Sequence, residues 1–359
     1  MTEPLPQGAV IGILGGGQLG RMLSVAAARL GFKTCIFEPS GDCPASHVAN
    51  YHFRAEYDDT QALRRFAEAV DVVTYEFENI PTAALDTIEA LRLVRPGRAA
   101  LAASQDRLAE KRFLQGLGLQ TAPFAEVTDR PSLDLALEAV GLPAILKTAR
   151  LGYDGKGQAR LDSPADAEAA LDAMGGAAAV LEGFVKFERE VSVIAARGAD
   201  GAVAAFDPGE NLHEAGILRR TIVPARLSPG QRSDAVLIAA RILNALDYIG
   251  VLGVELFVTP AGLIVNEIAP RVHNSGHWTQ NACAVDQFEQ HVRAVAGWPL
   301  GDGRRFADVE MTNLIGEDVA GLPDLARAPD TALHLYGKAE ARPGRKMGHA
   351  NRILRRPGA

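Results

Sequence analysis

The sequence contains few cysteines, and they are not grouped. Only three occur in 359 residues, Cys35, Cys43 and Cys283, and their spacing matches neither a metal-binding pair nor a disulfide framework. Reduced thiols of this kind are typical of a cytoplasmic protein, and Cys35 lies in an apolar segment that predicts a core strand. The opening segment MTEPLPQ lacks the basic and apolar parts of a signal peptide. We therefore expect a cytoplasmic protein.

The sequence also lacks long hydrophobic runs and long blocks of one charge. No apolar run approaches the roughly 18 residues that cross a bilayer, and the net charge of -7 is spread along the chain. We therefore expect neither a membrane nor a nucleic-acid partner. Apolar residues make up 47% of the chain and charged residues 23%, which permits a large core and excludes a disordered chain. The length suits two or three domains.

Two neighbouring apolar segments each contain one carboxylate. The runs VLGVELFV and GLIVNEIA, residues 251–258 and 262–269, flank a short turn and predict two antiparallel strands. The first contains Glu255, and the second contains Glu267 beside Asn266. A carboxylate in a buried strand is costly unless it is paired or binds a cation, so the two glutamates predict a shared Mg²⁺ site. The alternative is an edge pair whose side chains face solvent.

A polar loop follows the second of these strands. Residues 269–277 read APRVHNSGH and combine the cation Arg271 with an amide, Asn274, and the imidazoles of His273 and His277. Beside a metal site, such a loop is a reasonable place for chemistry on an anionic substrate.

A glycine-rich turn lies near the start of the chain. The apolar run AVIGIL precedes Gly15, Gly17 and Gly20, a helical pattern follows, and Glu38 ends the next predicted strand. The spacing matches the dinucleotide-binding pattern GxGxxG and raises the alternative of an NAD-dependent dehydrogenase. The physics is more general, because a glycine turn at a helix N-terminus presents N–H groups to any phosphate. Glu76 ends a further strand of the same predicted doubly wound α/β domain.

Two more segments have a composition suited to phosphate. The strand PAILK ends on Lys147 and is followed by LGYDGKGQ, a flexible loop that is not a Walker A sequence and could equally be a hairpin turn. Near the end of the chain, basic residues lie among glycines. This cluster is either a solvated face or a phosphate clamp, and contains Lys338, Arg342, Arg345, Lys346 and His349.

In this order, the strand-ending lysine, the glycine-rich loop, the segment VLEGFV and two carboxylates ending in NE resemble the ATP-grasp superfamily. The segments GGGQLGRML, YDGKGQ, REVSVI, NEIAPRVHNSGHWT and LHLYGKAEARPGRKMGH together resemble the N5-carboxyaminoimidazole ribonucleotide synthetases of purine biosynthesis. The resemblance extends over nearly the whole chain, and the last two segments are its most specific parts.

The resemblance implies an ATP-grasp fold of mixed α/β and α+β class with an N-terminal Rossmann-like domain, the pre-ATP-grasp domain. Residues 1–102 would bind substrate and not NAD. Residues 103–182 would form a central lid over the nucleotide, and residues 183–359 would contribute the metal site and the catalytic loop.

The resemblance also implies site residues, matched position by position. Those for the nucleotide are Arg107, Lys147, Gly152, Tyr153, Asp154, Gly155, Lys156, Gly157, Gln158, Glu182, Gly183, Phe184, Val185, Glu190, His213, Asn266 and Glu267. The metal ligands are Glu255 and Glu267. Those for the ribonucleotide are Gly17, Gln18, Leu19, Glu76, Asn274, Ser275, Lys338, Arg345 and Lys346. The catalytic candidates are Arg271, His273, Tyr153 and Asp154.

The implied reaction uses ATP, Mg²⁺ and bicarbonate to carboxylate 5-aminoimidazole ribonucleotide through carboxyphosphate, in a homodimeric enzyme. Another ATP-grasp enzyme, such as a formate-dependent transformylase or a biotin carboxylase, would share the nucleotide half and differ in the acceptor. A dehydrogenase, or a protein that only binds ligands, would leave the two strand glutamates unexplained.

Overall fold

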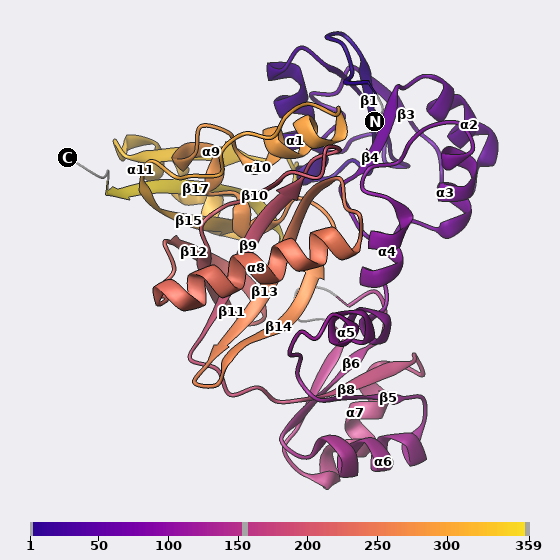
Figure 1. Ribbon diagram of the computed structural model, residues 1–359, viewed down its shortest axis with the longest axis vertical. Helices are drawn as coiled ribbons and strands as arrows, with labels where there is room; N and C mark the ends of the chain where they lie inside the picture. Colours follow the sequence, from indigo (N-terminus) through magenta and orange to yellow (C-terminus); the bar gives the residue numbers. More distant parts are fainter. Residues whose placement is uncertain (1–2, 153–156, 356–359) are drawn as a thin grey trace.

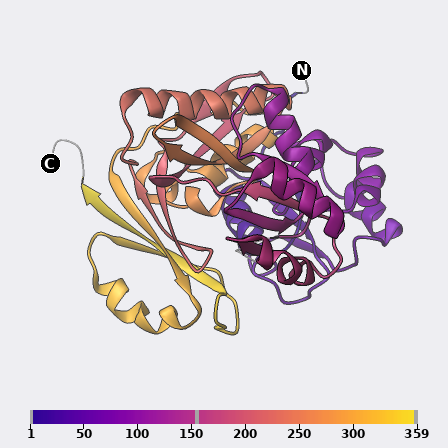
Figure 2. The ribbon, with the colours of Figure 1, turned by 90° about the horizontal axis from the view of Figure 1, so that it is seen from below.

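The computed structural model describes residues 3–152 and 157–355. Within these residues the strands form three sheets, one in each of three parts of the molecule. The N-terminal part lies at the top of Figure 1, the central part lies at the bottom, and the large C-terminal sheet lies beside both. Figure 2 shows the same arrangement from below, with the central part seen in front of the N-terminal part.

The N-terminal part is a parallel sheet covered by helices. Its strand order is β3-β2-β1-β4, and all three pairings are parallel. Parallel strands are buried on both faces, which explains why runs such as VIGIL and VVTY are mostly apolar and almost entirely buried. The predicted Rossmann-like domain is confirmed. Its elements are β1 (Val10–Leu14), α1 (Gln18–Arg29), β2 (Lys33–Phe37), β3 (Tyr51–Phe53), α2 (Thr60–Glu68), β4 (Val72–Tyr75) and α3 (Thr82–Glu89).

Two short helices, α4 (Arg98–Ser104) and α5 (Arg107–Gly116), connect this part to the central part. The side chain of Asp106 begins α5 by accepting hydrogen bonds from the N–H groups of Leu108 and Ala109 at 3.0 and 3.1 Å. The central sheet is antiparallel in the order β5-β8-β6-β7. Its elements are β5 (Phe124–Val127), α6 (Arg130–Val140), β6 (Ala144–Thr148), β7 (Gln158–Leu161), η1 (Pro164–Asp166), α7 (Ala167–Met174) and β8 (Ala179–Gly183).

The C-terminal sheet has the order β14-β13-β9-β11-β12-β15-β17-β16, with β10 beside β9. The antiparallel pair predicted at residues 251–269 is present, and β14 forms one edge of the sheet. The strands are β9 (Arg189–Arg197), β10 (Val203–Ala205), β11 (Gly209–Glu214), β12 (Ile217–Val223), β13 (Gly250–Thr259), β14 (Gly262–Ala269), β15 (Asp308–Ile315), β16 (Thr331–Leu335) and β17 (Lys346–Arg355).

Helices cover this sheet and join it to the N-terminal part. Helix α8 (Pro229–Ala245) and helix α10 (Gln287–Val295) contact β9 and β13. The imidazole of His291 on α10 lies 2.8 Å from the Thr74 hydroxyl of β4, and Asp286, which caps the start of α10, pairs with Arg29 of α1 at 2.8 Å. The remaining short helices are η2 (Asn274–Gly276), α9 (Thr279–Ala282), η3 (Gly316–Gly321) and α11 (Leu322–Arg327).

Two predictions from composition can be compared with this architecture. All three cysteines are buried free thiols, and Cys35 lies in the core of the N-terminal part as predicted. None of the helices formed by the described residues is long and apolar enough to cross a membrane.

Candidate active site

One cavity of about 710 Å³ lies where the three parts of the chain meet. The N-terminal part contributes the glycine turn and Glu76, the connecting helix contributes Arg107, and the central part contributes Lys147. The C-terminal sheet contributes Glu255, Glu267 and the loop that follows them. Side chains that are more than 100 positions apart in the sequence therefore face one space.

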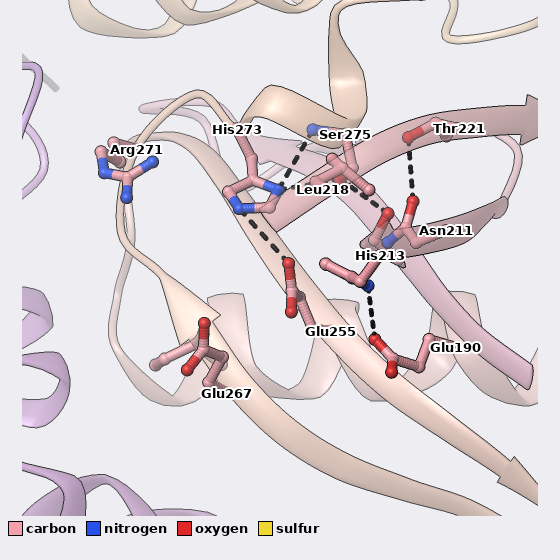
Figure 3. Close-up of polar contacts among 12 residues, drawn as sticks. Glu190, Asn211, His213, Leu218, Thr221, Glu255, Glu267, Arg271, His273 and Ser275 are labelled. Carbon is pink, nitrogen blue, oxygen red and sulfur yellow. Dashed lines mark hydrogen bonds and ion pairs between the residues drawn. The ribbon is translucent and has the colours of Figure 1, made fainter. Parts of the chain in front are cut away.

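The two strand glutamates lie directly opposite each other. Glu255 of β13 pairs in register with Glu267 of β14, and a bulge follows at the next position. Both line the cavity, and Figure 3 shows both side chains on the same side of the two strands. Burial, and then the charge of Glu267, raises the pKa of Glu255 to about 7. The alternative of a solvent-facing edge pair is wrong for Glu255, because only 16% of its side chain is exposed.

The donor set suits a hard cation that arrives with other oxygen ligands. The described residues contain no group of three or more histidine, cysteine, aspartate or glutamate side chains arranged for a metal. Two carboxylates are too few to complete the octahedral coordination of Mg²⁺, but they fit a site that phosphate oxygens and water complete. The pKa of Glu255 is raised first by burial and then by the charge of Glu267, and a divalent cation between the two carboxylates would favour their ionised forms.

Basic side chains lie beside Glu267 and beside a further buried carboxylate, Glu182. Arg107 forms an ion pair with Glu267 at 3.1 Å. Lys147 and Lys111 both approach Glu182, at 2.9 and 3.3 Å. Although burial raises the pKa of Glu182, the lysines outweigh it and hold that pKa below its usual value. The other carboxylate oxygen of Glu182, Oε1, is buried without a hydrogen-bond partner.

A second acid and an apolar wall lie nearby. Glu190 of β9 pairs with Nδ1 of His213 of β11 at 2.8 Å, and both line the cavity. Burial lowers the pKa of His213, but Glu190 outweighs it and the net shift is upward. Phe187 stacks on Phe257 with ring centroids 4.7 Å apart, and both also line the cavity. The two phenylalanines can therefore pack against a flat ring, with Glu190 nearby to accept hydrogen bonds from hydroxyl groups.

The predicted polar loop faces the same space. Arg271 makes a two-point ion pair with Glu78 at 2.6 and 3.2 Å, and Glu78 lines the cavity beside it. The imidazole of His273 lies between Ser275, 2.8 Å from Nδ1, and Glu255, 3.4 Å from Nε2. Burial, followed by the charges of Arg271 and Lys346, lowers the pKa of His273 to about 3. His273 is therefore neutral near pH 7.

The backbone of His273 is held by one amide side chain. Gln287 accepts a hydrogen bond from the His273 N–H at 2.9 Å and donates one to its carbonyl at 2.8 Å. Gln287 is fully buried at the start of α10. The position of the catalytic candidate is thus fixed by α10, which also contacts the N-terminal part.

The glycine turn already has an acceptor from within the chain. Glu76 accepts hydrogen bonds from the N–H groups of Gly17 and Gly20, the latter at 2.7 Å, and Glu38 accepts one from Gly16 at 3.1 Å. Burial raises the pKa of Glu76 despite these bonds. A Cβ atom at Gly17 would lie 2.5 Å from the Glu76 carboxylate, so the turn and this carboxylate are built against each other.

The other predicted residues divide into three groups. The first lines the cavity and contains Gln18, Leu19, Gly152, Gln158, Phe184, Asn266, Asn274 and Lys346. Both polar atoms of the Asn274 side chain are buried without a partner. The second group does not line the cavity that the described residues form, and contains Gly157, Glu182, Gly183, Val185, Ser275, Lys338 and Arg345. The third lies outside the described residues and contains Tyr153, Asp154, Gly155 and Lys156.

The second group still supports the first. Ser275 bonds the His273 imidazole, and Glu182 bonds Lys147. Lys338 donates a hydrogen bond to the carbonyl of Lys346 at 2.7 Å. Arg345 donates one to the carbonyl of Glu340 at 3.1 Å.

Several residues of the site were not predicted from the sequence, among them Glu78, Glu110, Lys111 and Phe187. Glu110 accepts a hydrogen bond from the Ile268 N–H at 2.6 Å, and burial, followed by the charge of Glu267, raises its pKa to about 8. The signal in the sequence was weak, because Glu110 and Lys111 belong to a charged helix that looks solvated. Glu78 follows Glu76 by two positions at a strand end, which was the one available hint.

Three family models match successive parts of the chain. They are the ribonucleotide synthetase preATP-grasp domain at residues 9–105, the ATP-grasp domain at residues 112–288, and the phosphoribosylaminoimidazole carboxylase C-terminal domain at residues 310–357. The N5-carboxyaminoimidazole ribonucleotide synthase of Brucella melitensis is 55% identical over 352 residues, which are 97% of this chain and 97% of that protein. The chain belongs to the N5-carboxyaminoimidazole ribonucleotide synthase family.

Other members of the N5-carboxyaminoimidazole ribonucleotide synthase family agree in sequence and in fold. The Bacillus subtilis enzyme is 42% identical over 95% of this chain and 90% of its own length. The Staphylococcus aureus enzyme, crystallised with ADP, is 38% identical with a TM-score of 0.94, covering 98% of this chain and 95% of that one. The Aspergillus clavatus enzyme, crystallised with ADP and 5-aminoimidazole ribonucleotide, is 30% identical with a TM-score of 0.91, covering 97% and 94%.

These comparisons confirm the predicted family, the ATP-grasp fold and the preATP-grasp domain. The chain is an ATP-grasp ligase of purine biosynthesis, and ATP is its nucleotide. The dehydrogenase alternative explained only the glycine turn, whose N–H groups bind the carboxylates of the chain itself. The individual site residues and the Mg²⁺ ion remain predictions.

Proposed function

We propose that this chain uses ATP and bicarbonate to carboxylate the exocyclic amine of 5-aminoimidazole ribonucleotide. The observation that supports the proposal is a single cavity with two chemically distinct ends. The Glu255 and Glu267 pair lines it and is called the metal end below; the glycine turn with Glu76 also lines it and is called the glycine end. Arg271 and His273 lie on the loop that follows β14 and line the same cavity.

The nucleotide is assigned to the end near β6, β8 and β9. Lys147 and Arg107 are the cations available to phosphate oxygens, and Glu190 is the acid for the ribose hydroxyls. Phe184, Val185 and Gly183 follow Glu182 at the end of β8, where they would receive the adenine ring. The loop that includes Gly152, Gly157 and Gln158 would cover the phosphates.

Glu255 and Glu267 would hold Mg²⁺, with Asn266 beside them. When bound, the ion would neutralise charge on the phosphates during transfer. The ion would also offset the repulsion from Glu267, which adds to burial in raising the pKa of Glu255. Arg107, already paired with Glu267 at 3.1 Å, would then be shared with a phosphate oxygen.

In the first chemical step, an oxygen of bicarbonate attacks the γ-phosphorus of ATP and the bond to ADP breaks, giving carboxyphosphate. Lys147 and Arg271 would stabilise the charge that develops on the transferring group. Carboxyphosphate is short-lived in water, so it must form in a closed site. Tyr153 and Asp154, together with Gly155 and Lys156, would complete that closure.

In the second step, carboxyphosphate releases phosphate, and the substrate amine forms the new C–N bond to its carboxyl carbon. The amine must lose a proton to form the carbamate. Because the pKa of His273 is lowered to about 3, released phosphate is the stronger base, and we assign the proton to it. The neutral His273, held by Ser275 and Gln287, would position the carboxylate instead.

The ribonucleotide is assigned to the glycine end. Glu76 and the unpartnered amide of Asn274 would bind its base and ribose. Its 5′-phosphate would lie between the start of α1, at Gln18 and Leu19, and Lys346, with Lys338 and Arg345 behind. The N–H groups of Gly17 and Gly20 are occupied by Glu76, so Gly17 serves the substrate by placing that carboxylate.

We also propose that the enzyme is cytoplasmic and acts as a homodimer, as the resemblance of its sequence implied. Sedimentation of the purified protein tests the second point. A mass near twice 38.1 kDa is expected, and a monomer at micromolar concentration would contradict it.

The test of the function is a substrate-dependence assay. Purified protein receives Mg²⁺, ATP and bicarbonate, and ADP release is measured with and without 5-aminoimidazole ribonucleotide. We expect the ribonucleotide to stimulate ADP release strongly and to be carboxylated in the same proportion. Ribose 5-phosphate, which keeps the anionic group and lacks the amine, is the matched control and should not stimulate. Equal ADP release with both compounds would refute the proposal.

A further inference from the structure

The strand that carries Glu267 lies at an edge of the C-terminal sheet, since β14 has β13 on one side only. The outer N–H and C=O groups of an edge strand need partners from elsewhere. At Val265 the partner is a backbone carbonyl, because the Val265 N–H donates to Gln120 at 2.8 Å. Beyond that point, the partners are side chains of α5.

Two consecutive residues of α5 form hydrogen bonds with the backbone of β14 on either side of Glu267. Glu110 accepts a hydrogen bond from the Ile268 N–H at 2.6 Å, and Lys111 donates one to the Asn266 carbonyl at 3.3 Å. Both side chains are almost fully buried, at 3% and 1% residue exposure. Together they reproduce the donor and acceptor that a neighbouring strand would offer.

The same helix face also reaches the Glu267 side chain. Arg107 lies three and four positions before Glu110 and Lys111, so all three project from one side of α5. Arg107 pairs with the Glu267 carboxylate, while its two neighbours hold the backbone around it. The bulge after Glu255 leaves Asn266 without a partner on β13, which makes the outer contacts more important for its position.

We propose that Glu110 and Lys111 are positioning residues that lock the backbone of β14 at Asn266–Ile268 and thereby aim the Glu267 carboxylate at the metal. The proposal rests on the proposed function insofar as Glu267 is a metal ligand. Lys111 also pairs with Glu182, which bonds Lys147. The same side chain therefore connects β14 to the central part of the molecule. Neither residue lies on the two strands for which the sequence predicts metal ligands.

The test compares Glu110→Ala with Glu110→Gln, which keeps an oxygen acceptor for the Ile268 N–H. Arg112→Ala, on the exposed face of the same helix, is the matched control. The first readout is hydrogen exchange of the peptide that contains residues 262–269, measured without nucleotide or metal. We expect faster exchange at the Ile268 amide in Glu110→Ala, near-native exchange in Glu110→Gln, and no change in Arg112→Ala.

The second readout is divalent-cation affinity, measured by Mn²⁺ titration in the presence of a non-hydrolysable ATP analogue. We expect Glu110→Ala to weaken Mn²⁺ binding about tenfold, the effect typical of lost support behind a metal ligand. Native exchange and native Mn²⁺ affinity in Glu110→Ala would overturn the proposal. Wild-type protein that lacks ribonucleotide-stimulated ADP release would instead overturn the proposed function, so the two failures are distinguishable.

Unfolding of the Glu110→Ala protein is a third outcome that the exchange experiment detects. If exchange rises in peptides of the N-terminal sheet as well, the role of Glu110 is general stability and the proposal is wrong. If Glu110→Gln restores the fold but still shows weak Mn²⁺ binding and fast exchange at Ile268, the oxygen acceptor is not what positions the strand, and the proposal is again wrong.

Discussion

The two ends of the cavity hold their buried carboxylates in different ways. At the glycine end, Glu76 is satisfied by backbone N–H groups of the turn. At the metal end, Glu255 faces Glu267 across two paired strands, and its nearest cationic candidate is an imidazole 3.4 Å away that is neutral near pH 7. Glu76 therefore accepts two backbone hydrogen bonds, whereas Glu255 has a second carboxylate directly opposite it, whose charge the proposed Mg²⁺ ion would offset. This contrast is the one we expect between a carboxylate that shapes the proposed substrate site and one that would hold the proposed Mg²⁺ ion.

Removal of charge at the metal end should have the largest effect. We expect Glu255→Gln and Glu267→Gln each to lower kcat by about 1000-fold, roughly 4 kcal/mol of transition-state stabilisation, because the size is kept and the cation loses a ligand. Steady-state ADP release at several Mg²⁺ concentrations measures this effect. Glu126→Gln, an exposed carboxylate of β5, is the control and should leave kcat unchanged. Near-normal turnover of either variant at modest Mg²⁺ would remove that residue from the metal site.

A change at the glycine end should affect a different substrate. In Gly17→Val the new Cβ would lie 2.5 Å from the Glu76 carboxylate and displace it. We expect kcat/KM for the ribonucleotide to fall on the order of 100-fold, with little change in the KM for ATP. Gly321→Val, where a Cβ meets no atom within 4 Å, is the matched control. Equal losses for both substrates would show that the two ends are not separate.

Tyr153 and Asp154, which lie outside the described residues, are predicted to keep carboxyphosphate away from water. Tyr153→Ala or Asp154→Ala should lower carboxylated product severalfold more than ADP release, because carboxyphosphate would form and then be lost to water. The ratio of product to ADP measures the coupling. A variant that loses both in equal proportion would show that these residues serve nucleotide binding alone.

The smallest effect concerns stability without metal. The pKa of Glu255 is raised from 4.5 to about 7, mainly by burial and then by Glu267. Between these pH values the folded state keeps a proton that the unfolded chain releases, so wild-type stability falls as pH rises through the window. Glu255→Gln cannot ionise, so its Tm should exceed that of the wild type by a margin that grows from pH 4.5 to about 7 and then levels off. Thermal unfolding in EDTA measures the margin, and a constant difference across that range would contradict the assignment.

The sequence was most informative where local pattern and chemistry coincide. The two apolar runs and the turn between them were enough to predict that Glu255 and Glu267 lie on neighbouring antiparallel strands, but not that they lie opposite each other. The register set by the turn would place Asn266 opposite Glu255, and the bulge between Glu255 and Leu256 places Glu267 there instead. The glycine turn, the strand end at Glu76 and the polar loop at Arg271 follow from equally local rules. In each case the residue and the element that positions it are close in the chain.

The sequence was least informative where burial depends on distant contacts. Glu110 and Lys111 look like the solvated face of α5, but their partners on β14 lie more than 150 positions away. Likewise, nothing local indicates that Gln287 holds His273, since α10 must first pack beneath the loop. The occupation of the glycine turn by Glu76 could not be predicted from a pattern that equally fits phosphate.

The most direct test of the account follows one oxygen atom from bicarbonate into the released phosphate. Wild-type enzyme receives ¹⁸O-labelled bicarbonate, Mg²⁺, ATP and 5-aminoimidazole ribonucleotide, and the released phosphate is examined by ³¹P NMR. If bicarbonate attacks the γ-phosphorus and the carboxyl group then passes to the amine, each phosphate will contain one oxygen from bicarbonate, in proportion to carboxylated product. Phosphate whose new oxygen comes from solvent water would contradict the account.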